Sequence, residues 1–252
     1  MRIGSTRRFV IYLALLTCAL VGLWYVIGHF HQPTPNRSEA QAPIYYGIDV
    51  SHYQGDLIVD LPKHTGLHFI IAKATNGAKG VDAKFAENWS AIKAHGRIRG
   101  AYHFYIAGES PQAQAIHFIN TVGQWADSDI TPIVDVEQYS VSHDKSVSQL
   151  HEDLLRFLDY VESNTGRLPM IYSNTKFAQM WLNNSEFGRY PLWLADYTKA
   201  KKPVVPEVWR HQGLFIWQRS DTYKLDSTEV DYDVFRGELS QLSGFNHKLR
   251  QQ

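Results

Sequence analysis

The sequence predicts an α/β fold, a TIM-like barrel of the (β/α)5(β)3 type, preceded by one N-terminal transmembrane helix. Residues 9–30 form an uninterrupted apolar run. From Tyr45 onward, short runs rich in β-branched and aromatic residues alternate with longer segments of helical character, without repeats or a second linker. Eight such runs occur, and only the first five are followed by helical segments. This pattern favours a closed barrel whose last helices are reduced, with a doubly wound open sheet as the alternative.

The N-terminal segment has the features of a membrane anchor. Its apolar run is 22 residues long and has no formally charged residue, which suits a helix that spans a bilayer. Three arginines in residues 1–8 predict a cytoplasmic basic N-terminus. Residues 31–43 have the composition of a polar linker with prolines. We therefore expect a single-pass protein of the cytoplasmic membrane with its soluble part outside the cytoplasm, periplasmic or extracellular. Secretion after cleavage of a signal peptide is the alternative.

The soluble part is predicted to be one domain, residues 44–240, followed by a C-terminal tail, residues 241–252. The expected strands are 45–50, 68–74, 98–105, 130–137, 168–173, 190–197, 213–220 and 229–235. The expected helical segments are a short turn near 57–64, helices over 82–95, 146–165 and 174–182, and a helix that opens at Ser110-Pro111, a capping residue before a first-turn proline.

The charge distribution excludes partners that need a basic face. Of the 25 basic and 25 acidic residues, four basic and one acidic residue lie within residues 1–39, so the rest of the chain has a net charge of −3. Nucleic acids bind to clustered Lys and Arg side chains that neutralise phosphates. We therefore expect no nucleic-acid partner.

Polar and aromatic side chains gather near the carboxyl ends of the expected strands, where barrels of this kind carry their chemistry. Each residue alone also has an ordinary structural explanation, such as a loop cap for Asp196 or a turn for Asp231. Agreement among four strand ends is harder to explain in that way. The residues concerned are Asp49, His103, Tyr105, Asp135, Glu137, Tyr172, Trp193, Asp196, Gln218 and Asp231.

The segment PIVDVEQ, residues 132–138, places two acids where the fourth strand is expected to end. Side chains two residues apart on a strand face the same side, so Asp135 and Glu137 should both point into the barrel mouth, with Cβ atoms roughly 7 Å apart. Glycoside hydrolysis uses such a carboxyl pair. Like charges this close raise the pKa of one member, which keeps an acid protonated near neutral pH. With aromatic rings nearby, the pair predicts catalysis on a sugar.

Six motifs in this order resemble those of the glycoside hydrolase family 25 lysozymes, also called Chalaropsis-type muramidases. They are GIDVSHYQG, GAYHFY, PIVDVE, PLWLADY, IWQRS and VDYDVF, and the similarity extends over residues 45–237. The resemblance implies a β-1,4-N-acetylmuramidase that cleaves bacterial peptidoglycan between N-acetylmuramic acid and N-acetylglucosamine. It also implies an eight-stranded barrel with five helices. The reaction needs no metal and no organic cofactor.

The resemblance also assigns roles to residues. Glu137 matches the general acid. Asp135 matches the carboxylate that supports reaction at the anomeric carbon, either as the nucleophile or by orienting the substrate's own acetamido group. Asp49 and Asp231 match two further active-site acids. We expect substrate contacts from His103, Tyr105, Tyr172, Trp193, Asp196 and Gln218.

Two positions depart from the family pattern. Asp233 stands where the family usually has Asn, which adds a carboxylate near Asp231. Asn76 stands where a Glu is common. Both leave the catalytic pair intact, but they are expected to alter sugar contacts or the pH preference.

Two other classes of function compete with a hydrolase. A membrane-anchored module that binds the cell wall without catalysis would keep Trp193 and Tyr172, but it would not need the acids, all of which are present. A metal-dependent deacetylase is suggested by His64-x-x-x-His68, yet Gly66 interrupts the helix that this spacing requires. We expect a monomer that acts on glycan strands in wall remodelling, in killing of neighbouring cells or in phage lysis.

Overall fold

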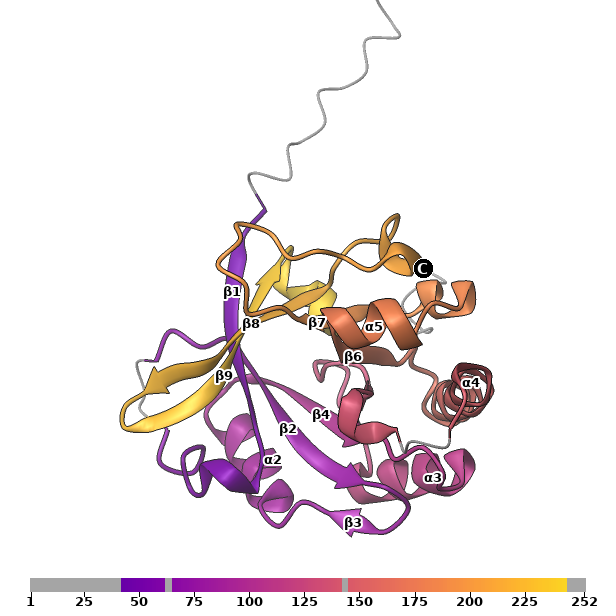
Figure 1. Cartoon of the computed structure of the whole chain (residues 1–252). Coiled ribbons are helices and arrows are strands. Elements are labelled where there is room, and N and C mark those ends of the chain that lie inside the picture. The colour runs from indigo at the N-terminus through magenta and orange to yellow at the C-terminus, as the bar shows by residue number, and fades with distance from the viewer. Residues whose placement is uncertain (1–41, 62–64, 142–144, 244–252) are drawn as a thin grey trace, which may run out of the picture. The chain divides into compact units, whose positions relative to one another are not determined.

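The computed structural model describes residues 42–61, 65–141 and 145–243. In this part of the chain, eight strands form a closed ring with a short ninth strand at one side, and helices connect them (Figure 1). The strands are β1 (Ile44–Val50), β2 (Phe69–Asn76), β3 (Gly80–Val81), β4 (Ile98–Phe104), β5 (Ile133–Asp135), β6 (Met170–Asn174), β7 (Leu192–Ala195), β8 (Ile216–Leu225) and β9 (Thr228–Arg236). The α-helices are α2 (Phe85–Ala94), α3 (Pro111–Val122), α4 (Val147–Thr165) and α5 (Thr175–Trp181).

Strand pairing closes the sheet into a barrel. The strands follow in the order β1-β9-β8-β7-β6-β5-β4-β2, and β2 pairs with β1 again, with Gly47 opposite Phe69. Neighbours in the ring are parallel except β9, which is antiparallel to both β8 and β1. The predicted barrel is confirmed in this respect. The open doubly wound sheet is excluded, because the ring of eight strands has no free edge.

Capping residues explain where the helices begin and end. The hydroxyl of Ser110 accepts a hydrogen bond from the first turn of α3. α4 begins with a capping box formed by Ser146 and Gln149. It ends at Gly166, which has the left-handed conformation that favours glycine, with φ at 67°. These ends agree with the helices predicted from the sequence.

The helices cover only part of the barrel's outer surface. α2 packs on β2 and β4, α3 packs on β2 and α4, and α5 packs on β6. No α-helix of the described residues contacts strands β1, β8 or β9 to this extent, and tyrosine rings stack there. Tyr46 and Tyr223 each stack on Tyr232, with ring centroids 5.6 Å and 4.4 Å from it.

Three local features differ from the prediction. A helical turn was expected near residues 57–64. Residues 55–60 do form turns, with the N–H of Asp60 donating to the carbonyl of Asp56 at 3.1 Å, but the 3-10 helix lies earlier, at η2 (His52–Gln54), and residues 62–64 lie outside the described part. β3 is an additional strand, antiparallel to β2. β8 and β9 continue past the barrel as a hairpin (Figure 1). The turn of this hairpin contains Asp226 at φ 53°, a conformation that Asp tolerates better than most residues.

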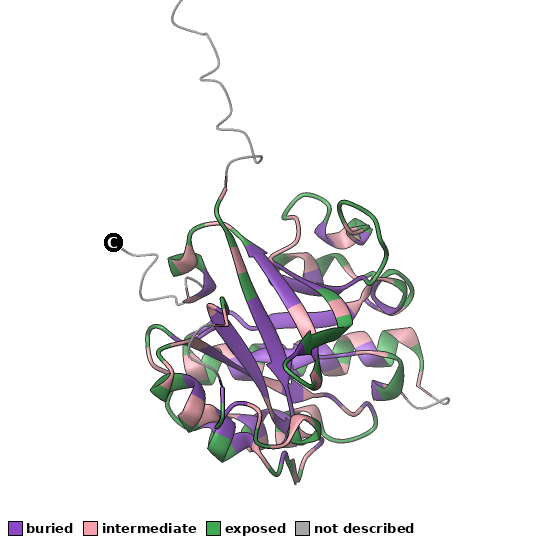
Figure 2. Cartoon of the chain, turned by 90° about the vertical axis from the view of Figure 1, so that its left-hand side faces the viewer, coloured by how far each residue is buried: buried purple, intermediate pink, exposed green. Residues whose placement is uncertain are grey.

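Two apolar layers stabilise the barrel. Inside it, Phe69, Ile133 and Phe235 are at most 1% exposed. Gly47 faces this interior, where an added Cβ would lie 2.3 Å from the Phe69 ring, so the position requires glycine. A second layer, to which Val134 belongs, lies between the strands and the helices. Figure 2 shows the buried strands inside a more exposed outer surface. Side chains thus fill the barrel and confine open space to one end.

No helix within the described residues has both the length and the apolar character needed to cross a membrane. The anchor predicted at residues 9–30 lies outside the described part, as do residues 1–8. The tail predicted at residues 241–252 is described only as far as residue 243.

Candidate active site

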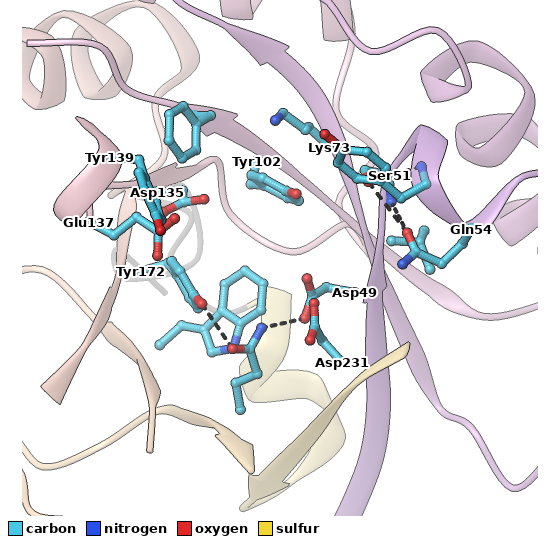
Figure 3. Close-up of a pocket in the computed structure, with 15 residues that line it drawn as sticks. Asp49, Ser51, Gln54, Lys73, Tyr102, Asp135, Glu137, Tyr139, Tyr172 and Asp231 are labelled. Atoms are coloured by element: carbon cyan, nitrogen blue, oxygen red, sulfur yellow. Dashed lines mark hydrogen bonds between the residues drawn. The ribbon is translucent and has the colours of Figure 1, made fainter. Parts of the chain in front are cut away.

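A cavity of about 460 Å³ opens at the carboxyl ends of the parallel strands, with side chains from all eight barrel strands in its walls (Figure 3). Asp49 and Asp231 lie opposite each other on the antiparallel pair β1 and β9. Asp135 and Glu137 belong to β5 and the turn that follows it. The structure therefore brings together the four acids that the sequence predicted at one end of the barrel.

Backbone geometry directs Asp135 and Glu137 into the cavity. Asp135 is the last residue of β5, and Glu137 follows in extended conformation, with φ −145° and ψ −171°. Val136, between them, packs into the outer core. Residues so placed have Cβ atoms roughly 7 Å apart. The carbonyl of Asp135 accepts from the N–H of Tyr105 at 2.9 Å, and the N–H of Glu137 donates to Ser140 Oγ at 3.0 Å. These two hydrogen bonds fix the backbone at both Asp135 and Glu137.

The environment of this pair favours a retained proton. Asp135 is 7% exposed, and its Oδ1 meets no hydrogen-bond partner among the described residues. Burial raises the pKa of Asp135, the charge of Glu137 raises it further, and Lys73 opposes the rise. Burial also raises the pKa of Glu137, with Lys73 lowering it and Asp231 raising it. Both acids therefore bind protons more tightly than exposed acids do, which favours one protonated acid beside one carboxylate.

A second pair of acids, Asp49 and Asp231, lies across the cavity, and Gln218 orients Asp49 (Figure 3). The Nε2 of Gln218 donates to Asp49 Oδ2 at 2.7 Å, while its Oε1 accepts from Tyr172 Oη at 2.9 Å and from Tyr197 Oη at 2.5 Å. Burial raises the pKa of Asp49, and the charge of Asp231 raises it further. Burial raises the pKa of Asp231 to about 6. This pair too binds protons more tightly than exposed acids do.

Asp233 lies next to the second pair and deeper in the barrel. It is 0% exposed, its Oδ1 accepts from Trp193 Nε1 at 2.8 Å, and its Oδ2 has no hydrogen-bond partner in the described part of the chain. The Trp193 ring meets the Tyr172 ring edge to face at 4.5 Å. Burial raises the pKa of Asp233 well above its usual value and the charge of Asp231 adds to this, whereas the hydrogen bond from Trp193 and the neighbouring Asp49 carboxyl oppose the rise. The hydrogen bond from Trp193 to Asp233 thus fixes the indole ring of Trp193, which lines the cavity.

Three residues expected at the cavity do not line it. His103 and Tyr105 lie on the outer side of their segment, because side chains alternate along a strand and Tyr102 and Phe104 face the cavity. His103 bonds to a threonine of β2 and a glutamine of α3, and burial lowers its pKa to about 3. Asp196 caps the loop after β7, where its carboxylate accepts from two backbone N–H groups. This is the loop cap that the ordinary structural explanation of Asp196 describes.

Two tyrosines at the cavity mouth were missed from the sequence. Tyr53 and Tyr139 line the cavity, yet they are 82% and 87% exposed. Tyr53 lies in η2, where the backbone N–H of Ser51 donates to Gln54 Oε1 at 2.9 Å and fixes the turn. Tyr139 lies in the 3-10 turn that follows Glu137. Strand alternation does not extend into turns, so periodicity could not place either ring.

Lys73 and Tyr102 also line the cavity and were not predicted as site residues. Lys73 pairs with Tyr102 across β2 and β4. Both alternate with residues that the structure shows to face inward, since Tyr102 precedes Phe104 by two residues and Lys73 follows Ile71 by two.

The acids of the cavity do not gather into a metal site. In residues 42–61, 65–141 and 145–243, no three His, Cys, Asp or Glu side chains meet in an arrangement that could hold a metal ion. Of the spacing His64-x-x-x-His68, the first histidine lies outside the described residues. The cavity presents carboxylic acids, phenols, two amides and one amine from the described residues. Carboxylic acids so paired can perform general acid catalysis at a glycosidic bond.

A closed α/β barrel with paired acids at the carboxyl ends of its strands defines a hydrolase of the glycosidase class. The chain belongs to glycosyl hydrolases family 25, whose family model matches residues 48–228. The resemblance seen in the sequence is thereby confirmed.

Individual relatives agree with this family. The chain is 34% identical over 228 residues to the uncharacterized protein YegX of Escherichia coli O6:H1, covering 86% of this chain and 80% of that protein. It is 30% identical over 215 residues to an N,O-diacetylmuramidase of Arthroderma benhamiae, covering 82% and 88%. The bacterial lysozyme from Streptomyces coelicolor superposes with a TM-score of 0.74 at 27% identity, covering 81% of this chain and 98% of that one.

Proposed function

We propose that this glycoside hydrolase cleaves peptidoglycan at the β-1,4 bond between N-acetylmuramic acid and N-acetylglucosamine. The observation that carries the proposal is the pair of the buried Asp135 and the half-buried Glu137 at the open end of a family 25 barrel. The substrate is supported by relatives named as a muramidase and a lysozyme, most of whose length this chain covers.

Glu137 is the general acid in this proposal. It lies nearer the cavity mouth than Asp135 and is only half-buried, so it can reach the oxygen that links two sugars. Its raised pKa keeps it protonated at a pH where an exposed Glu is ionised. Asp135, deeper in the wall, either attacks the anomeric carbon or orients the substrate's acetamido group for that attack. Both routes retain the anomeric configuration, whereas direct attack by water inverts it. Inverted product, observed by NMR at early times, would exclude both routes.

The second pair of acids serves binding in this proposal. Asp49 and Asp231 face the same space as the catalytic pair, and each accepts hydrogen bonds from sugar hydroxyls or, when protonated, donates to them. Gln218 fixes Asp49 through a hydrogen bond. Trp193 and Tyr172 form an apolar wall on which a sugar ring packs. These contacts place the glycosidic oxygen at Glu137.

The experiment compares the wild type with Glu137→Gln and Asp135→Asn on purified peptidoglycan. Glu152→Gln, an exposed position on α4, is the matched control. Products are reduced with borohydride and identified by mass spectrometry. Reduced muramic acid ends from the wild type and the control, with a loss of about 10²-fold or more in kcat for Glu137→Gln, support the proposal. Reduced glucosamine ends would contradict the bond assignment. Binding without cleavage by the wild type would favour a wall-binding module.

We further propose that residues 9–30 anchor the enzyme in the cytoplasmic membrane, with the barrel outside the cytoplasm as a monomer. The support is the sequence, namely an uncharged apolar run after three arginines and before a polar linker. The full-length chain should be found in the membrane fraction, and deletion of residues 1–30 should release it. A mature protein whose mass lacks the N-terminal segment would show cleavage instead.

A further inference from the structure

Lys73 differs from every other charged group at the cavity. It is the only basic side chain among the described residues that line it, whereas Asp49, Asp135, Glu137 and Asp231 are acids. Its Nζ forms no ion pair with a carboxylate of the described residues. It lies instead 4.9 Å from the centre of the Phe104 ring. A cation in an acidic cavity that is not neutralised by a bonded carboxylate is available to a ligand.

The geometry of β2 directs the side chain of Lys73 into the cavity. Pairing of β2 with β4 shifts between Lys73 and Thr75. Up to Lys73 the side chains alternate, with Ile71 inward. After it, Ala74 packs in the outer core, and Thr75 also turns outward, where its Oγ1 bonds to His103 Nδ1 at 2.8 Å. Such β-bulges redirect side chains and occur beside active sites. Lys73 is thus the last inward residue of β2 before the irregularity.

The proposed substrate poses an electrostatic problem for this cavity. N-acetylmuramic acid differs from N-acetylglucosamine by a lactyl ether at O3, which ends in a carboxylate when no stem peptide is attached. A cavity lined by carboxylic acids repels such an anion whenever those acids are ionised. Lys73 is the cavity group with the charge to offset this.

We propose that Lys73 binds the lactyl carboxylate of peptide-free muramic acid and so distinguishes this sugar from N-acetylglucosamine. The inference rests on the proposed muramidase function. In the barrel, β2 is separated from β5 by β4 alone, and Lys73 pairs with Tyr102, which pairs with Ile133, two residues before Asp135. The backbones of Lys73 and Asp135 therefore lie roughly 12 Å apart. The lysine side chain extends across part of this distance, over Phe104, which pairs with Asp135. Tyr102 lies between them (Figure 3). This space suits one sugar ring whose anomeric carbon faces the acids and whose C3 substituent faces the amine.

A second role for Lys73 makes a different prediction. Its charge lowers the pKa values of Asp135 and Glu137, and this effect would act on every substrate alike. A contact with the lactyl carboxylate acts only on ligands that carry that carboxylate. The comparison of matched ligands therefore separates the two roles.

The test measures binding by calorimetry with the full chain carrying Glu137→Gln, so that ligands are not cleaved. Three tetrasaccharides are used, a peptide-free alternating N-acetylglucosamine–N-acetylmuramic acid chain, its carboxyl methyl ester, and chitotetraose. Lys73→Met, which keeps length and loses charge, should weaken binding of the first by about tenfold to one hundredfold. Binding of the other two should change by no more than about twofold. Lys73→Arg should restore the preference, and Lys79→Met, an exposed lysine away from the cavity, should leave it unchanged.

Equal weakening of all three ligands by Lys73→Met would overturn the inference and assign Lys73 a general role in the site. Unchanged binding of the muramic acid ligand would overturn it as well. The proposed function has its own readout, because hydrolysis of peptidoglycan by the wild type is measured separately. Cleavage without carboxylate selectivity refutes only the inference, and selectivity without cleavage refutes only the activity.

Discussion

Replacement of Asp233 by Asn should stabilise this protein, and more so as the pH rises. Asp233 is fully buried, has one bonded and one unbonded oxygen, and lies beside Asp49 and Asp231. The amide keeps the oxygen that accepts from Trp193 Nε1. It also removes a group that must either hold a proton or carry an unpaired charge in the barrel interior.

The sign and size of the effect follow from the raised pKa of Asp233. The folded state binds the proton of this carboxyl more tightly than the unfolded state, whose Asp titrates near pH 3.9. The contribution of Asp233 to stability is therefore fully present below that pH and is lost as the pH rises through the folded pKa. The loss is about 1.4 kcal/mol for each unit of elevation. Leaving a buried polar atom unsatisfied costs about 1–3 kcal/mol. We expect Asp233→Asn to gain about 1–3 kcal/mol at pH 8 and little at pH 4.

The assay is urea denaturation of the wild type and Asp233→Asn at pH 4, 6 and 8. Asp226→Asn, in the exposed turn of the β8–β9 hairpin, is the control and should show no difference that grows with pH. A variant that is destabilised by the same amount at every pH would refute the reasoning. That result would mean that the cavity wall needs the carboxyl group itself and that its charge has no cost.

Three further predictions concern the cavity. The rate of hydrolysis should fall as the pH rises through the elevated pKa of Glu137, because only the protonated acid donates, and a pH–rate profile that rises over this range would assign the acid elsewhere. Tyr139→Ala and Tyr53→Ala should each raise KM several-fold, by roughly 1 kcal/mol of lost ring contact, and leave the urea midpoint unchanged because both rings are exposed. A lowered midpoint would show that the rings support the turns instead. Gln218→Leu should lower the free energy of unfolding by about 1–3 kcal/mol, because it removes the donor to the buried Asp49, and unchanged stability would contradict that dependence.

Much of the fold could be predicted because its signals are local. The α4 helix begins and ends at its capping serine and its left-handed glycine, and both are visible in the sequence. The D-x-E pair could be predicted for the same reason, since alternation along one strand places Asp135 and Glu137 on one side whatever the rest of the barrel does.

The errors came from side chains whose direction depends on their neighbours. His103 and Tyr105 were expected at the cavity because they lie near a strand end, but Tyr102 and Phe104 take the inward positions. How near each residue lies to the end of its strand could be estimated from the sequence. Which side of the sheet its side chain faces was decided by the pairing of β4 with β2 and β5. Tyr53 and Tyr139 lie in turns, where no periodicity applies.

The sequence by itself determined the order of strands and helices, the helix ends and the placement of both D-x-E acids on one side of the chain, because each depends on residues within a few positions of one another. Only the tertiary structure decided that Asp231 lies opposite Asp49, since this depends on the antiparallel direction of β9. It also decided that Lys73 shares one cavity with four acids and that Asp233 is buried. Those properties arise when strands distant in the chain close into a ring. Charged side chains that are far apart in the sequence then lie close enough in space to affect one another.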